Sequence, residues 1–330
     1  MKKILLVLIA VGFANLAANA QKFDVSIETR YSDFSSLERR TLVVEILEKN
    51  EFTLAKLNKE IKDNPEGVTN YLAFIDNYNE NIKKAVTAYW KLNTEIEYKT
   101  SAEIKKMIEG RDRKSIMLSP VEVGGTDAFI TRKEGTAIML VLYRPEKSTA
   151  EPDYKIMMPY AAMRRKAENI ESDFSFTIKM AASNIAYMLE KKTTSDAYDF
   201  METQAMANCA KLDKKKTLLI DAELLSPKAD KDGIRKYYEK SKFKVEKDHD
   251  DIDKAIAAND AETFYMVLIP FSTFTNPFDR VKKTYILCYK VIVSAENMEV
   301  VNYMEGKAKA SPDVALIQEK DFKDLNECAF

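Results

Sequence analysis

The chain has 330 residues, with 51 Lys and Arg, 52 Asp and Glu and a single His, which gives a formal net charge of −1. Nucleic-acid-binding proteins show a basic excess or a basic stripe, so this balance of charges argues against a nucleic-acid partner. With 46% hydrophobic and 31% charged residues, the composition is typical of a globular protein, and the length is sufficient for two domains.

Residues 1–20 have the pattern of a cleaved export signal. A basic start is followed by the apolar run 4–13, and Ala18 and Ala20 occupy the small-residue positions before the cleavage point. We therefore expect a mature chain that begins at Gln21 and is periplasmic or extracellular. Cleavage removes two Lys and no acid, so the mature charge is about −3.

The alternative for this segment is a membrane anchor. A spanning helix needs about 20 apolar residues, and Asn15 and Asn19 interrupt this run. The rest of the chain has no comparable run, so we expect no transmembrane segment after cleavage. A lipid anchor is disfavoured because no Cys lies near the cleavage point.

Two similar stretches, RRTLVVEIL at 39–47 and KKTLLIDAEL at 215–224, predict two equivalent strands. The intervals that follow them differ by 28 residues, because Thr41 and Thr217 are 176 positions apart and later matches are 148 apart. The first copy therefore carries an insertion at about 48–76. Its apolar residues have near-helical spacing before an Asn-Pro-Glu-Gly break, which predicts an additional helix and a turn.

The later matches extend over about 75 positions at one offset. The matched pairs are Lys99/Lys247, Ile104/Ile252, Lys106/Lys254, Ile108/Ile256, Asp112/Asp260, Thr136/Thr284, Ile138/Ile286 and Phe174/Phe322. A constant offset indicates an internal duplication. The alternative is a chance match between two α/β stretches, since the identity is low and small gaps separate the matches.

Hydrophobic patterning predicts the same element order in both copies, β-α-β-α-β-β-β, in an α/β or α+β fold with mixed sheets. In the second copy, a turn at Asp232-Gly233 opens the first helix, and a short helix lies near Asp321. The predicted divisions are a signal at 1–20, a first unit at 21–175, a helical connection at 176–214 and a second unit at 215–330.

The sequence offers few residues for catalysis. His249 is the only His, in KDHDDID at a helix start. One hypothesis is a metal cluster with Asp248, Asp250 and Asp251. Consecutive residues cannot all face one ion, however, so we favour helix capping by Asp beside a solvated His. We predict no catalytic residue and no metal site.

Glycine is too scarce to supply a phosphate-binding loop. The chain has eight Gly, whose only pair is Gly124-Gly125, and no G-x-G-x-x-G or Walker sequence. We therefore expect no nucleotide and no other cofactor. The single Trp, Trp90, follows an amphipathic stretch and is predicted to be a core residue.

The chain has three cysteines, Cys209, Cys288 and Cys328. Their number and spacing do not match a zinc site. Cys288 lies within an apolar strand and is expected to be a buried thiol. Cys209 and Cys328 could form a disulfide in an oxidising compartment.

Phe271, Phe274 and Phe278 are candidate binding residues, because PFSTFTNPFDR at 270–280 is predicted to be a loop between two strands. The alternative is that these rings fold under the sheet as core. We expect the function of a non-catalytic binding or assembly module of the bacterial cell envelope, with an unknown protein or envelope ligand as partner. The alternative function is a hydrolase that acts through carboxylates on an exported substrate.

Overall fold

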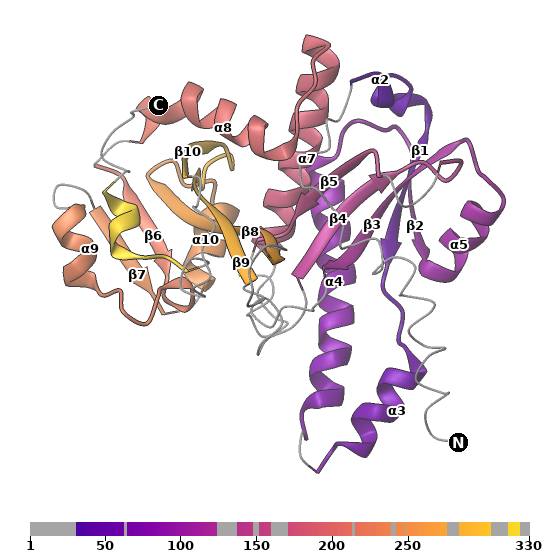
Figure 1. Cartoon of the computed structure of the whole chain (residues 1–330), viewed down its shortest axis with the longest axis horizontal. Helices are drawn as coiled ribbons and strands as arrows, with labels where there is room; N and C mark the ends of the chain where they lie inside the picture. The colour runs from indigo at the N-terminus through magenta and orange to yellow at the C-terminus, as the bar shows by residue number, and fades with distance from the viewer. Residues whose placement is uncertain are drawn as a thin grey trace.

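The computed structural model describes residues 31–62, 65–123, 137–147, 152–159, 171–212, 215–238, 242–247, 249–275, 284–304 and 316–323. Only the backbone is described for residues 122–123, 137, 270–275 and 284–287. The described chain forms two five-stranded mixed sheets with helices packed against them (Figure 1). The predicted fold class is therefore confirmed.

The first unit starts with the short helices α2 (Tyr31–Phe34) and η1 (Leu37–Arg39). Its strands are β1 (Thr41–Ile46), β2 (Ile96–Thr100), β3 (Ser115–Val123), β4 (Ala137–Tyr143) and β5 (Tyr154–Met157), arranged as β2-β1-β3-β4-β5. β1 is parallel to β2 and β3, and β4 is antiparallel to β3 and β5. Helices α3 (Glu51–Lys59) and α4 (Gly67–Tyr89) connect β1 to β2, and α5 (Ser101–Glu109) connects β2 to β3.

The second unit has the same strand arrangement. Its strands are β6 (Thr217–Asp221), β7 (Lys242–Glu246), β8 (Thr263–Thr275), β9 (Thr284–Ser294) and β10 (Val300–Met304), arranged as β7-β6-β8-β9-β10. β6 is parallel to β7 and β8, and β9 is antiparallel to β8 and β10. Its helices are η3 (Ala222–Leu224), α9 (Lys231–Tyr237), α10 (Asp250–Ala257) and η5 (Glu319–Phe322). The duplication itself stays a prediction, although the two units share their order of elements.

Helices α5 of the first unit and α10 of the second unit also end in the same way. Arg111 after α5 and Asn259 after α10 both have a φ of 50°, the left-handed conformation that stops a helix. The next backbone N–H folds back over the last turn in each case, from Asp112 to the Met107 carbonyl and from Asp260 to the Ala255 carbonyl, both at 3.0 Å. These paired bonds make a Schellman end at an offset of 148 residues.

The start of α9 corrects one expectation from the sequence. Asp232 and Gly233 lie in the first turn of α9 and do not form a separate turn before it. The helix begins earlier because Asp230 is its N-cap, and Oδ1 of Asp230 accepts a hydrogen bond from the Gly233 N–H at 2.7 Å.

Consecutive apolar residues explain why the parallel strands lie inside the molecule. Leu42, Val43 and Val44 of β1 are all buried, and so are residues 218–220 of β6. Successive side chains of a strand point to opposite faces, so both faces of these strands are covered. A strand with one face exposed to solvent would instead show alternating buried and exposed residues.

Helix α7 (Glu171–Lys191) lies between the units, and α8 (Ala197–Asn208) with η2 (Cys209–Lys211) follows it. Most residues of α7 are buried, polar ones such as Thr177 and Asn184 included, because the helix is enclosed between the two units. One continuous core joins the first sheet, α4, α7 and one face of the second sheet, and a smaller core covers the opposite face under α9 and η5. Trp90 is buried, as predicted.

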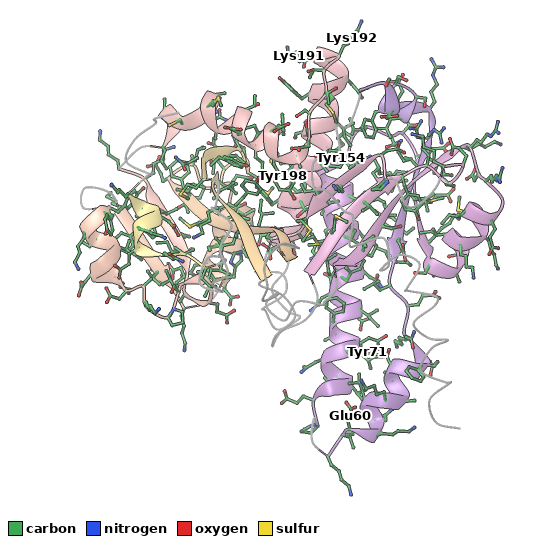
Figure 2. All side chains as sticks on the ribbon, in the orientation of Figure 1. Glu60, Tyr71, Tyr154, Lys191, Lys192 and Tyr198 are labelled. Atoms are coloured by element: carbon green, nitrogen blue, oxygen red, sulfur yellow. The ribbon has the colours of Figure 1, made fainter. Side chains whose placement is uncertain are left out.

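A row of tyrosines joins α8 to both sheets. The Tyr198 ring stacks on Tyr289 of β9 with centroids 5.0 Å apart, and Tyr289 stacks on Tyr303 of β10 at 5.2 Å. On the other side, the Tyr198 hydroxyl accepts a hydrogen bond from the Met157 N–H of the first sheet at 3.4 Å. Figure 2 shows Tyr198 beside Tyr154 where the two units meet. The connecting helices therefore fasten the units together.

Candidate functional site

The aromatic stretch chosen from the sequence is a strand in its first half. β8 continues through Pro270 to Thr275 and pairs with β9, so Phe271 and Phe274 lie in a strand and not in a loop. Pro270 is tolerated because the pairing has an irregularity between Pro270 and Ser272, at Phe271. The side chains of both Phe residues, and all of Phe278, lie outside the described residues. Their role in binding stays a prediction.

The cysteines differ in chemical state. Cys209, in η2, is disulfide-bonded. Cys288, in β9, is a buried free thiol, and burial raises its pKa to about 12. Cys328 lies outside the described residues, so its predicted pairing with Cys209 stays a prediction.

His249 contacts two other segments in the interior of the molecule. Its Nδ1 lies 3.2 Å from Oδ2 of Asp221, the last residue of β6, and its Nε2 lies 2.9 Å from Oγ of Ser172 in the first turn of α7. His249 is 4% exposed and is itself the N-cap of α10, with no side-chain capping bond, so the expectation of a solvated His beside a capping Asp is wrong. The cause is topological, because β7 runs parallel to β6 and ends beside it, which brings the start of α10 to Asp221.

Further polar groups surround this His249 cluster, which we define as Ser172, Asp221 and His249. Oδ1 of Asp253, one turn along α10, lies 3.6 Å from Nε2 of His249. The hydroxyl of Tyr265, in β8, is buried, and its pKa is raised well above its ordinary value, first by burial and then by the charges of Asp173 and Asp253. The cluster therefore lies close to several acidic side chains in the interior.

The first unit has a matching contact at the same positions. Ser101 at the start of α5 donates a hydrogen bond from its hydroxyl to Oε1 of Glu45 in β1. Glu45 precedes Asp221 by 176 positions and Ser101 precedes His249 by 148, the two offsets that the predicted duplication gives for these segments. The first pair ties the end of β1 to the start of α5, and the second pair ties the end of β6 to the start of α10. His249 adds a contact with α7 that the shorter Ser101 side chain does not make.

The Ser172, His249 and Asp221 side chains have the order of groups found in a nucleophile-base-acid triad. A nucleophile must reach its substrate, however, and Ser172, His249 and Asp221 are 4%, 4% and 1% exposed. The equivalent contact in the first unit needs no His. We therefore interpret the cluster as a structural tie. Ser172 and Asp221 were not predicted, because they lie 77 and 28 residues from His249 in the chain and no local pattern links them to it.

The second candidate is a helical arm, defined here as α3 with residues 60–62 and the N-terminal half of α4. Figure 1 shows it extending away from both sheets, and Figure 2 shows Glu60 and Tyr71 on it. No residue of α3 is buried, yet the arm carries Phe52 and Ile61, which are 61% and 47% exposed. The segment predicted as an insertion, 48–76, corresponds to this arm.

The arm is held firmly at its base. The side-chain amide of Asn79, in α4, accepts from the Leu47 N–H at 2.8 Å and donates to the Leu47 carbonyl at 3.0 Å. The Tyr71 hydroxyl accepts from the Asn50 N–H at 2.9 Å, and the Asn50 side chain caps α3. These bonds fix α3 against α4 although α3 contributes nothing to the core.

In the part of the chain that the structure describes, no group of three or more His, Cys, Asp or Glu side chains is placed so that it could hold a metal ion. No described helix combines the length and apolar character that crossing a membrane requires. Comparisons of the chain with protein-family models, with curated proteins and with solved structures gave no match.

Proposed function

We propose that the protein is a non-catalytic assembly module of the bacterial cell envelope, and that the helical arm is its contact with a partner protein. The observation that carries this proposal is the exposure of Phe52 and Ile61 on an arm that buries none of the residues of α3. Covering a side chain of this size with a partner contributes roughly 1.5–3 kcal/mol when burial is complete. Helices that dock by their apolar side chains are a recurrent mode of protein recognition.

The second unit supports a specialised role for the arm. Its corresponding connection, between β6 and β7, contains η3 and α9, and it folds back on its own sheet with Ile234 and Tyr238 buried. The first unit instead extends its connection into the arm. A helix such as α3, which buries none of its residues while large apolar side chains on and beside it stay exposed, is explained by a contact outside the chain.

Crosslinking in cells tests the arm directly. A photo-crosslinking amino acid at position 52 should give a defined adduct with one partner protein, and the Ile61→Asp variant should lose it. The matched control carries the same amino acid at Lys105, an exposed position on α5 with a side chain 77% exposed, and should give no such adduct. Equal crosslinking from both positions, or none from position 52, would refute the proposal.

Stability measurements separate a binding defect from a folding defect. Phe52 and Ile61 are exposed, so Phe52→Asp with Ile61→Asp should leave the melting temperature of the isolated protein within about 2 °C of wild type. Lys56→Glu, on the same helix, is the control for added negative charge. Loss of the adduct together with a large fall in melting temperature would indicate a folding defect.

Export is part of the same proposal, supported by the basic, apolar and small-residue pattern of residues 1–20. Mass spectrometry of protein from the periplasm of a bacterial host should give a mature N-terminus at Gln21. Recovery of the full-length chain in the membrane fraction would contradict this.

The Ser172, His249 and Asp221 side chains suggest a different enzyme from the carboxylate-dependent hydrolase expected from the sequence, namely a serine hydrolase, and chemical labelling tests it. A serine-reactive fluorophosphonate should not label the native protein, because Ser172 is buried. Labelling that disappears in Ser172→Ala would favour the hydrolase over the assembly module.

A further inference from the structure

The His249 cluster lies where the connecting helix meets the second unit. Ser172 belongs to α7, whereas Asp221 and His249 belong to the second unit. The hydrogen bond between Ser172 and His249 is therefore a direct polar contact across this junction. Histidine is the side chain whose unperturbed change of charge falls between pH 5 and 8, and this chain has only one.

The neighbours of the ring assign its neutral tautomer. The Asp221 carboxylate, when ionised, can only accept hydrogen bonds, so Nδ1 carries the proton and donates to Oδ2 of Asp221. Nε2 then has a lone pair, and the Ser172 hydroxyl donates to it across 2.9 Å. In this state the cluster holds the first turn of α7 against the second unit.

Asp253 gives the ring a second possible partner. Among the described residues its Oδ1 is a buried oxygen without a hydrogen-bond partner, and it lies 3.6 Å from Nε2. A neutral ring presents only a lone pair there, so it cannot satisfy this oxygen. A protonated ring carries an N–H at Nε2, and a charge-assisted bond to a carboxylate is stronger than one to a hydroxyl.

We propose that His249 is a pH-responsive contact: proton uptake moves its Nε2 hydrogen bond from Ser172 of α7 to Asp253 of α10. The bond across the junction is replaced by one within the second unit, and the first turn of α7 is released. This inference is independent of the proposed function, because the arm takes no part in it.

The groups that face the ring favour this exchange. They are Asp221 from β6, Asp253 from α10 and Ser172 from α7, and the buried Glu246 of β7 is in register with Asp221. The Asp221 and Asp253 carboxylates attract an imidazolium. Tyr265 of β8, close to Asp173 and Asp253, is uncharged because its pKa lies well above its ordinary value. Lys244 of β7 pairs with Asp251 on the exposed face of α10.

Hydrogen exchange of the full chain at pH 7.5 and pH 5.5 tests the proposal. The amides of residues 175–178 lose their helical hydrogen bonds when the first turn of α7 opens. After correction for intrinsic rates, their protection should fall about three- to tenfold at the lower pH, as expected for the loss of one hydrogen bond. Unchanged protection would overturn the proposal.

Three variants distinguish this exchange from a general effect of acid. Asp253→Ala removes the second acceptor, so it should keep its protection at pH 5.5. Ser172→Ala should show low protection at both pH values. Asp251→Ala removes an exposed acid from the same helix, and it should respond as wild type does. The same response in Asp253→Ala and Asp251→Ala would refute the role of Asp253.

The single His also permits a direct spectroscopic readout. A ¹⁵N–¹H correlation of the imidazole should show a proton on Nδ1 alone at pH 7.5 and on both nitrogens at pH 5.5. A ring that stays neutral at pH 5.5, or carries its neutral proton on Nε2, would contradict the assigned hydrogen bonds.

Discussion

Asp112 and Asp260, 148 positions apart, make the same two hydrogen bonds in the two units. Asp112 accepts from the Lys114 N–H at 2.8 Å and from the Ser115 hydroxyl at 2.6 Å. Asp260 accepts from the Glu262 N–H at 2.9 Å and from the Thr263 hydroxyl at 2.6 Å. Asp112 therefore fixes the turn that leads from α5 into β3, and Asp260 fixes the turn that leads from α10 into β8.

The first prediction concerns the pH dependence of these two turns. The hydrogen bonds from Thr263 and Glu262 lower the pKa of Asp260. For Asp112, burial raises the pKa, but the hydrogen bonds from Ser115 and Lys114 act against it, and the pKa is lowered on balance. A folded pKa below the unfolded one adds stability at higher pH, and this is lost as pH falls below about 4. Urea unfolding between pH 6 and pH 3 should show a smaller fall for Asp112→Asn with Asp260→Asn than for wild type. An equal fall would contradict the prediction.

The second prediction concerns the matched isoleucines. Ile104 and Ile252 are 3% and 0% exposed, so Ile104→Ala and Ile252→Ala should each lower the free energy of unfolding by about 2–5 kcal/mol. Ile108 and Ile256, one turn later, are only half-buried and serve as matched controls that should lose less. Denaturant unfolding measures all four. Similar losses at the buried and half-buried positions would show that these helices do not pack as described.

The third prediction concerns a buried ion pair of the first unit. Arg144 donates two hydrogen bonds to Asp153, at 2.9 and 2.6 Å, and the Asp153 side chain is 3% exposed. Asp153→Ala should lower the free energy of unfolding by about 1.5–3 kcal/mol, because Arg144 and Lys147 lose this buried partner while Arg144 keeps its bond to Asp33. Lys84→Ala, which removes an exposed pair with Glu80, should cost less than about 1 kcal/mol. Comparable losses in the two variants would argue against the buried pair.

The fourth prediction concerns the thiols. Cys288 should resist alkylation in the native protein, because it is buried and its pKa is raised to about 12. After unfolding without reductant, it should be the only cysteine that iodoacetamide labels, and peptide mapping should find Cys209 joined to Cys328. Cys209→Ser should cost about 2–5 kcal/mol of stability. Labelling of a second thiol before reduction would contradict the predicted disulfide.

Local patterns in the sequence determined the order of elements in both units. The apolar runs that follow Thr41 and Thr217 each belong to one segment of the chain, as does the helical spacing of Ile252 and Ile256. Each pattern therefore predicts the element that its own segment forms. The burial of Trp90 could be predicted for the same reason. The offset of 148 residues also relates positions of α5 and α10 that have the same local geometry, such as Arg111 and Asn259 at the ends of these helices.

The tertiary structure alone decided the environment of His249 and the length of β8. His249 meets partners 77 and 28 residues away in the chain, and only the packing of α7 against the second unit brings Ser172 to the ring. Pro270 marks the end of a strand in a local reading, but pairing with β9 continues past an irregularity there. Local patterns report the conformation of a segment, whereas burial and hydrogen bonding between distant segments depend on how the whole chain packs.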